Sequence, residues 1–150
     1  MNRRHFIGLG LFALSTAAVI GWLRTASLDD GITVYRSPTC GCCLAWVDHL
    51  RESGFTVSVE ETSDLAPIKQ ELGVPEDLES CHTATVGGYV VEGHVPAADI
   101  RQLLASKPNA KGLAVPGMPI GSPGMERGDE KEPYRVILFG ATGETVFATH

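Results

Sequence analysis

Three cysteines fall within four positions of the stretch "SPTCGCCLAW", at Cys40, Cys42 and Cys43. The stretch separates a β-rich run from a segment with helical periodicity, so the thiols are placed where a strand gives way to a helix. Cys40 and Cys43 have the two-residue spacing of a reversible disulfide. Cys42 does not fit a purely redox site, because an extra nucleophile beside such a disulfide can capture the wrong partner by exchange.

The elements around the cysteines alternate in type. Apolar spacing and turn residues predict a strand, a helix, a strand, a helix, two strands and a helix. The predicted ranges are 32–36, 43–54, 55–60, 63–73, 83–95 (two strands joined at Gly87-Gly88) and 96–106. Gly54 and Gly73 are expected to end the first two helices. Ser63 or Asp64 is expected to cap the second helix, and Pro96 to open the third.

This order resembles the thioredoxin and glutaredoxin arrangement, an α/β fold with a central mixed sheet and helices on both sides. Right-handed strand–helix–strand connections then place the cysteine loop at the carboxyl edge of the first strand, where open α/β sheets hold their sites. Two features depart from that arrangement: a long Gly/Pro loop over 111–133 and a C-terminal β-hairpin over 134–149 that turns at "GATG". A loop of this length is expected to be functional or disordered.

The N-terminus has the pattern of an export signal. Arg3 and Arg4 precede eighteen uncharged residues from Phe6 to Leu23, and "RRHFIG" resembles a twin-arginine signal. "RTAS" is a poor cleavage site, so removal and retention as a membrane anchor both stay open. A buried first helix is the less favoured alternative, because the apolar residues surround the whole helix. We therefore divide the chain into an export signal or anchor over 1–27 and one thioredoxin-like domain over 28–150.

The charge of the exported domain argues against nucleic acid. Three of the 12 basic residues (Arg3, Arg4 and Arg24) precede residue 28, whereas all 18 acidic residues follow it. A nucleic-acid partner requires a basic face that neutralises phosphates. The acidic balance favours solubility and would also suit a partner that carries cations.

The helix start suits the chemistry of thiolates. Unpaired N–H groups and the positive end of the helix dipole lower the pKa of a thiol there. At about 100° per residue, Cys40 and Cys43 project about 60° apart, and Cys42 about 100° from Cys43. Cys81 stands in "SCHTATV", in the slot that usually holds a cis-proline in the thioredoxin arrangement. By that analogy the four sulfurs can converge.

Three interpretations compete for the four thiols. A structural disulfide framework is the plainest for an exported protein, but clustered cysteines close loops poorly. A thiol–disulfide oxidoreductase would use Cys40 and Cys43 and would leave Cys42 without a role. Metal binding by thiolates is favoured. Four thiolates would satisfy structural zinc, whereas thiolate and thioether together select Cu(I).

Thioethers and imidazoles supply further candidate ligands. "PGMP" and "PGME" place Met118 and Met125 in the Gly/Pro loop, each after Pro-Gly. They are interpreted either as core residues or as a soft ligand or lid over the site. His82 adjoins Cys81 and is a candidate ligand. His94, in "EGHVP", is interpreted as a strand-end residue and His49 as a surface residue of the first helix.

Three blocks together resemble the exported copper-resistance family of the CopG type: "YRSPTCGCCLAW", "SCHTATVGGYVVEGHVPAADI" and "GLAVPGMPIGSPGME". The resemblance spans about residues 31–128 and leaves the C-terminal hairpin unmatched. It implies a periplasmic protein that binds Cu(I) in a thiolate-bridged multi-copper cluster, with a redox role in copper handling and contact with other periplasmic copper-handling proteins. The ligands implied are the thiolates of Cys40, Cys42, Cys43 and Cys81. In such a cluster Cys42 is a bridging ligand, which gives the third thiol a role.

Overall fold

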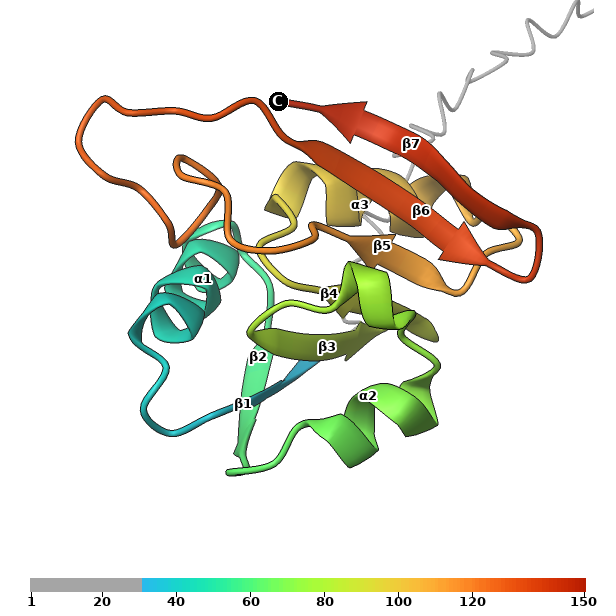
Figure 1. The fold of residues 1–150 in the computed structure, drawn as a ribbon, viewed down its shortest axis with the longest axis horizontal. Helices are drawn as coiled ribbons and strands as arrows, with labels where there is room; N and C mark the ends of the chain where they lie inside the picture. Colours follow the sequence, from blue (N-terminus) through green and yellow to red (C-terminus); the bar gives the residue numbers. More distant parts are fainter. Residues whose placement is uncertain (1–30) are drawn as a thin grey trace, which may run out of the picture.

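The computed structural model describes residues 31–150, which form a seven-stranded mixed sheet with helices packed against it (Figure 1). The predicted export signal or anchor over 1–27 lies outside the described residues. Within 31–150, no helix has the length and apolar character needed to cross a bilayer. The elements in chain order are β1 (Ile32–Arg36), α1 (Gly41–Glu52), β2 (Val57–Glu61), α2 (Ala66–Leu72), the 3₁₀ turn η1 (Glu76–Leu78), β3 (His82–Val86), β4 (Tyr89–Glu92), α3 (Ala97–Ser106), β5 (Gly112–Ala114), β6 (Arg135–Gly140) and β7 (Gly143–Thr149).

The strand order confirms the expected α/β fold. Across the sheet the strands run β2-β1-β3-β4-β5-β6-β7. β1 is parallel to β2 and antiparallel to β3, while β4 is antiparallel to β3 and parallel to β5. The predicted C-terminal hairpin is also confirmed, because β6 and β7 pair antiparallel and extend the sheet. The mixed sheet is that of a thioredoxin-like arrangement with strands added at one side.

Successive side chains of each strand point to opposite faces and build a core on each side of the sheet. On one face, α1 and α3 contribute residues such as Trp46 and Ile100 to the larger core. On the other, η1 contributes Leu78 to a smaller core. Neighbours in β4 divide accordingly, because Val91 belongs to the larger core and Val90 to the smaller one. Helical elements therefore cover both faces, as the sequence predicts.

The prediction of a structureless loop over 111–133 is wrong at its start. Gly112–Ala114 forms β5, which joins β4 to β6. A Cβ atom on Gly112 would overlap the backbone carbonyl of Val90, so only glycine allows this close pairing. The glycines of this segment indicate a loop in the sequence, but one of them, Gly112, is there because the close contact between two strands requires it.

Other boundaries also differ from the predictions. The first helix is Gly41–Glu52 rather than 43–54, and the strand pair predicted over 83–95 ends at Glu92. β2 begins at Val57 rather than at residue 55, because Phe55 turns into the larger core. The N-cap of α2 is Leu65 rather than Ser63 or Asp64. The Asp64 carboxylate, one residue before the N-cap, nevertheless accepts a hydrogen bond from the Ala66 N–H at 3.1 Å. It therefore supplies a partner for one of the free N–H groups at the start of the helix.

The segment between β5 and β6, orange in Figure 1, passes beside one end of α1. The two come close together at Gly124, which has a φ of +85°. A Cβ atom there would lie 2.7 Å from the Trp46 amide nitrogen and 2.8 Å from the Cys42 carbonyl oxygen. Glycine therefore lets the second Pro-Gly-Met sequence pack directly against the first turns of the helix that carries the thiols.

Substitution of the two glycines that precede the loop methionines tests this packing. Both have a positive φ, but nothing lies within 4 Å of a Cβ atom built on Gly117. We expect Gly117→Ala to lower the free energy of unfolding by about 1 kcal/mol, the cost of a left-handed alanine. Gly124→Ala should cost at least about 2 kcal/mol more, because the methyl group collides with α1. Urea unfolding of both variants measures the difference, and equal losses would contradict the packing.

Candidate metal centre

The strand registers explain why distant cysteines meet at one edge of the sheet. In the β1–β3 pair, Arg36 lies opposite His82, so the loop after β1 and the loop before β3 are adjacent. In the β3–β4 pair, Thr83 lies opposite Glu92, so the segment after β4 leaves from the same edge. β5 is parallel to β4 and ends there as well. Four segments therefore converge on one end of the sheet.

Four sulfur atoms lie together at this edge. The Sγ atoms of Cys40, Cys42, Cys43 and Cys81 are all within 4.8 Å of one another. Cys40 is the N-cap of α1, and Cys42 and Cys43 lie in its first turn, as predicted. No acidic residue occupies that turn, so no carboxylate competes with the thiol groups for the free N–H groups of the helix. The group can hold a metal ion through soft ligands.

Two of the four cysteines are joined by a disulfide and two are free. Cys40 bonds to Cys43, three residues away, while Cys42 and Cys81 are free thiols. The Cys42 sulfur lies 3.5 Å from that of Cys40 and 3.8 Å from that of Cys81. A disulfide that closes so short a loop removes little entropy from the unfolded chain. Its chemistry is therefore of more consequence than its contribution to stability.

Arg36 holds the cysteine loop from the end of β1. Its guanidinium group donates hydrogen bonds to the carbonyl oxygens of Ser37 at 2.8 Å and Cys40 at 3.2 Å, and pairs with the carboxylate of Glu61 on β2. The Arg36 side chain is buried, and a buried charge is costly unless paired and hydrogen-bonded. The bonds fix the backbone from which the first thiol projects.

His94 joins the site through its ring nitrogens. Nδ1 lies 2.8 Å from the carbonyl oxygen of Pro123, which can only accept, so Nδ1 carries the proton. In the neutral ring, Nε2 then has a free lone pair, and it faces the Cys81 sulfur at 3.2 Å. Metal-binding histidines commonly have one nitrogen fixed by a backbone carbonyl in this way. The sequence interpretation of His94 as a strand-end residue therefore misses its place beside the thiols.

His82 is the other imidazole beside Cys81. Its Nδ1 lies 3.3 Å from the Cys81 sulfur, and its ring packs 4.4 Å, between centroids, from that of Trp46. Its Nε2 is buried and has no hydrogen-bond partner among residues 31–150. A proton on Nδ1 can be donated to the sulfur and leaves only an acceptor unsatisfied at Nε2. Cys81, His82 and His94 thus form a second group of potential ligands that shares one sulfur with the first.

Burial keeps this second group uncharged. Burial and, next, the neighbouring Cys42 raise the pKa of Cys81 to about 12. Burial lowers the pKa of His94. It also lowers the pKa of His82 well below its usual value, and the next cause is the repulsion that a protonated His94 would exert. At neutral pH the Cys81 thiol therefore keeps its proton and the histidines stay neutral. Metal binding at Cys81 has to displace that proton.

Trp46 secures the segment that carries His94. Its indole Nε1 donates a buried hydrogen bond to the Val95 carbonyl at 2.9 Å. His49, interpreted from the sequence as a surface residue, is half-buried instead. Its Nε2 accepts a hydrogen bond from the Ala97 N–H at 3.1 Å, which satisfies the first turn of α3. α1 therefore holds both the thiols and the end of the His94 segment.

The two loop methionines lie in different environments. Met118 is 50% exposed, so it is not a core residue, whereas Met125 is half-buried. The carbonyl of Gly117, next to Met118, accepts a hydrogen bond from the Ser80 hydroxyl at 2.5 Å. Gly124, next to Met125, packs on the Cys42 carbonyl. The first Pro-Gly-Met sequence is thus bonded to Ser80, which precedes Cys81, and the second packs on Cys42 itself.

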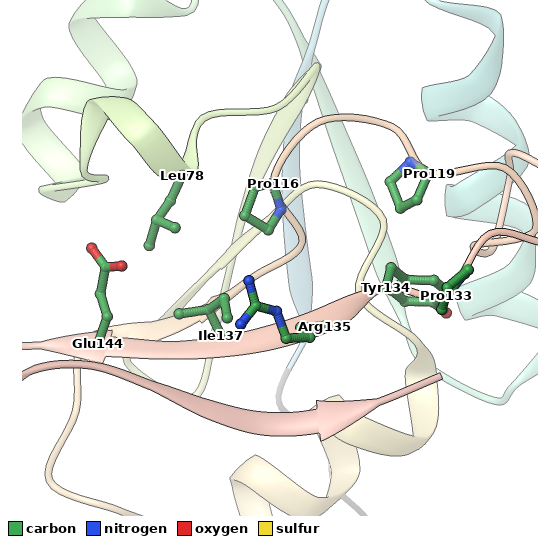
Figure 2. A pocket seen from close by; sticks show the side chains of 8 residues that line it. All are labelled: Leu78, Pro116, Pro119, Pro133, Tyr134, Arg135, Ile137 and Glu144. Carbon is green, nitrogen blue, oxygen red and sulfur yellow. The ribbon is translucent and has the colours of Figure 1, made fainter.

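A pocket of about 380 Å³ lies near η1, between the loop and β6 (Figure 2). Its lining residues are Leu78, Pro116, Pro119, Pro133, Tyr134, Arg135, Ile137 and Glu144. They include no thiol, thioether or imidazole. The soft-ligand chemistry therefore belongs to the sulfur cluster and not to this cavity.

Two solved structures resemble this chain over most of its length. They are Form 1 and Form 2 of a copper resistance protein copG, each with a TM-score of 0.77 and 45% sequence identity. Each match covers 81% of this chain and 98% of the other. A family model described as a protein of unknown function, DUF411, matches residues 78–125, a range that includes Cys81 and both loop methionines. No curated protein sequence matches the chain.

The raised pKa of Cys81 predicts how its alkylation depends on pH. The experiment uses the metal-free protein with the Cys40–Cys43 disulfide intact. Cys81 then reacts only in its ionised form, the thiolate, and not as the protonated thiol. Far below a pKa of about 12, the thiolate fraction and the rate of modification by iodoacetamide should rise about tenfold per pH unit from about pH 7 to 9. Peptide mass spectrometry separates Cys81 from Cys42. A rate that reaches a plateau within this range would show that the Cys81 environment is misassigned.

Proposed function

Because the chain belongs to the family of the copper resistance protein copG, we propose that it is a copper-resistance protein that binds Cu(I) through the thiolates of Cys40, Cys42, Cys43 and Cys81. The copper is cargo to be held and passed on. The observation that carries this proposal is the gathering of four sulfurs within 4.8 Å of one another at the start of α1. Soft thiolate ligands select Cu(I) over harder cations.

The position of Cys42 supports a cluster rather than a single ion. Its sulfur lies close to two others, 3.5 Å from that of Cys40 and 3.8 Å from that of Cys81. A thiolate has several lone pairs and can bind two Cu(I) ions at once. Sulfurs this close can therefore bridge several coppers once the disulfide is reduced. The imidazole of His94 and the loop methionines are proposed as additional ligands at the border of the cluster, with His82 as a less favoured one.

The Cys40–Cys43 disulfide favours a second, redox function at the same site. Oxidation of the two thiolates releases two electrons, which can reduce two Cu(II) ions to Cu(I) as the S–S bond forms. The reverse reaction consumes two electrons from a reductant, such as an external dithiol, and restores two thiolates for Cu(I) binding. The same pair would serve a thiol–disulfide oxidoreductase without copper. The two functions differ in their need for Cys42.

The proposed location is the periplasm. It is supported by the basic start and the uncharged run from Phe6 to Leu23, which have the pattern of an export signal. The periplasm is an oxidising compartment, so it permits the Cys40–Cys43 disulfide. A reduced copper site there would depend on a redox partner that supplies electrons. Other periplasmic copper-handling proteins are the proposed donors and acceptors. The test is fractionation of cells that carry the full chain, with a periplasmic marker enzyme as the reference.

An anaerobic Cu(I) titration against a chromophoric chelator tests the copper proposal. The fully reduced protein should bind more than one Cu(I) per chain, and zinc should not displace it. Cys42→Ser should lose the bridging ligand and retain copper at least about tenfold more weakly. Its Cys40–Cys43 pair should still reduce a disulfide substrate. Saturation at one copper, or a Cys42→Ser variant that binds like the parent, would contradict the cluster.

The methionines are predicted to modulate copper binding without being essential. A thioether is a weaker ligand than a thiolate, so Met118→Ala/Met125→Ala should keep the copper count and accelerate air oxidation of bound Cu(I) several-fold. Measurements of copper content, oxidation rate and melting temperature separate the possibilities. Lower stability with an unchanged oxidation rate would mean that the half-buried Met125 is a packing residue. Each single variant serves as the control for the double one.

A further inference from the structure

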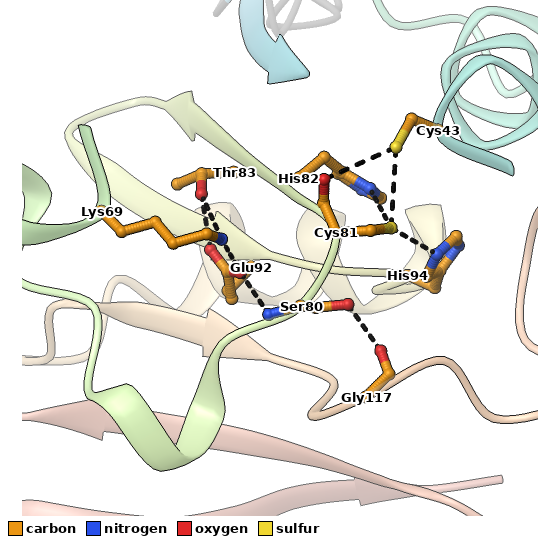
Figure 3. A network of polar contacts seen from close by, with 9 residues as sticks. All are labelled: Cys43, Lys69, Ser80, Cys81, His82, Thr83, Glu92, His94 and Gly117. Carbon is orange, nitrogen blue, oxygen red and sulfur yellow. Dashed lines mark hydrogen bonds and ion pairs between the residues drawn. The ribbon is translucent and has the colours of Figure 1, made fainter. Parts of the chain in front are cut away.

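A buried ion pair lies behind the loop that carries Cys81 (Figure 3). Lys69 of α2 is 4% exposed and Glu92, the last residue of β4, is fully buried. The Lys69 ammonium group donates to a carboxylate oxygen of Glu92, and to the Thr83 hydroxyl at 3.0 Å. The Thr83 hydroxyl donates in turn to the other carboxylate oxygen at 2.7 Å. The three side chains therefore satisfy one another on the face of the sheet opposite α1 and α3.

Glu92 also binds the residue next to Cys81. Its Oε1 atom accepts a hydrogen bond from the Ser80 backbone N–H at 2.6 Å. The Ser80 hydroxyl donates to the Gly117 carbonyl at 2.5 Å, so Ser80 is held on two sides. A Cβ atom on Gly93 would lie 2.7 Å from the Ser80 Cβ atom. Glycine at this position leaves room for Ser80 to approach the end of β4.

From these contacts we propose that Lys69 and Glu92 are positioning residues that hold Cys81 within reach of the three thiols of α1. Cys81 is the one sulfur of the cluster that comes from outside the segment 40–43, so its distance from the others depends on how the loop before β3 is fixed. No peptide bond in the described residues is cis, so the loop lacks the cis-proline of the thioredoxin arrangement. The buried carboxylate fixes the backbone in its place.

The choice of a charged pair at this position supports a positioning role over a packing role. Apolar residues of similar volume often replace a buried ion pair without loss of stability. They could not supply an acceptor for the half-buried Ser80 N–H, which would then lose its hydrogen-bond partner. Lys69 pairs with the carboxylate that accepts this bond and so orients it. The consequence for copper rests on the proposed function, but the position of the thiol does not.

Two neutral double variants isolate the Ser80 bond. Lys69→Met/Glu92→Gln removes both charges but leaves an amide oxygen that can accept from Ser80. Lys69→Met/Glu92→Leu removes the charges and the acceptor. Val90→Ala, in the same strand and on the same face, is the stability control, because it creates a cavity in the smaller core without touching Ser80.

The readout is cross-linking of Cys42 to Cys81 by dibromobimane in the full-length, copper-free protein with its disulfide intact. Only these two cysteines are then free, and their sulfurs are 3.8 Å apart. We expect the parent, Lys69→Met/Glu92→Gln and Val90→Ala to cross-link at similar rates. Lys69→Met/Glu92→Leu should cross-link at least about fivefold more slowly at a temperature where circular dichroism shows it folded. A parental rate for this folded variant would overturn the proposal.

Amide exchange of the parent provides a test that needs no folded variant. The Ser80 amide should exchange at least about tenfold more slowly than its unprotected reference rate, because Glu92 holds its proton. Fast exchange of this amide in the folded parent would overturn the proposal. Copper binding is measured separately on the reduced parent. If that protein binds no copper while the cross-linking pattern is as expected, the proposed function fails and the positioning role stands.

Discussion

The antiparallel pairing of β1 with β3 brings the four cysteines of the site together. Its register places Arg36 opposite His82, so the end of β1 lies directly beside the start of β3. Cys40 follows the first residue by four positions, and Cys81 precedes the second by one. A shift of the register by one residue would turn the buried side chains of β3 to the wrong face, so the core that requires this register also fixes the site.

Polar contacts then fix each segment at that edge. Arg36 holds the carbonyl of Cys40, Glu92 holds the amide of Ser80, and His94 is oriented by the carbonyl of Pro123. These are backbone contacts made by buried or half-buried side chains. They place the sulfurs without using a ligand atom, so the thiols remain free for a disulfide or for a metal. Under the proposed function, the site alternates between the Cys40–Cys43 disulfide and a copper-bound state of the four cysteines while these contacts stay in place.

Local patterns in the sequence predict most of the fold. The helix that follows the cysteines, the left-handed Gly73 at the end of α2 and the hairpin from β6 to β7 all arise from short-range patterns, and all are confirmed. β5 could not be predicted in this way, because its three residues lie in a Gly/Pro-rich run and are a strand only through their pairing with β4 and β6.

Only the part of the site that follows from the thioredoxin-like fold could be predicted from the sequence. The meeting of Cys81 with the α1 thiols follows from the thioredoxin-like order of strands. The place of His94 depends on a carbonyl 29 residues later in the chain, and nothing in "EGHVP" indicates that contact. From the sequence alone, Lys69 and Glu92 would be assigned to the surface, because charged side chains are seldom fully buried unless they are paired. Long-range contacts of this kind become visible only in three dimensions.

X-ray absorption spectroscopy at the copper edge shows whether the thiolates of this site bridge several copper ions. The reduced protein, loaded anaerobically with Cu(I), is measured beside a sample whose thiols have been blocked before loading. We expect a first shell dominated by sulfur and an additional copper–copper scattering path, because the thiolate of Cys42 is proposed to bridge metal ions. A first shell of nitrogen and oxygen, or a sulfur shell without any copper–copper path at full loading, would contradict a thiolate-bridged cluster.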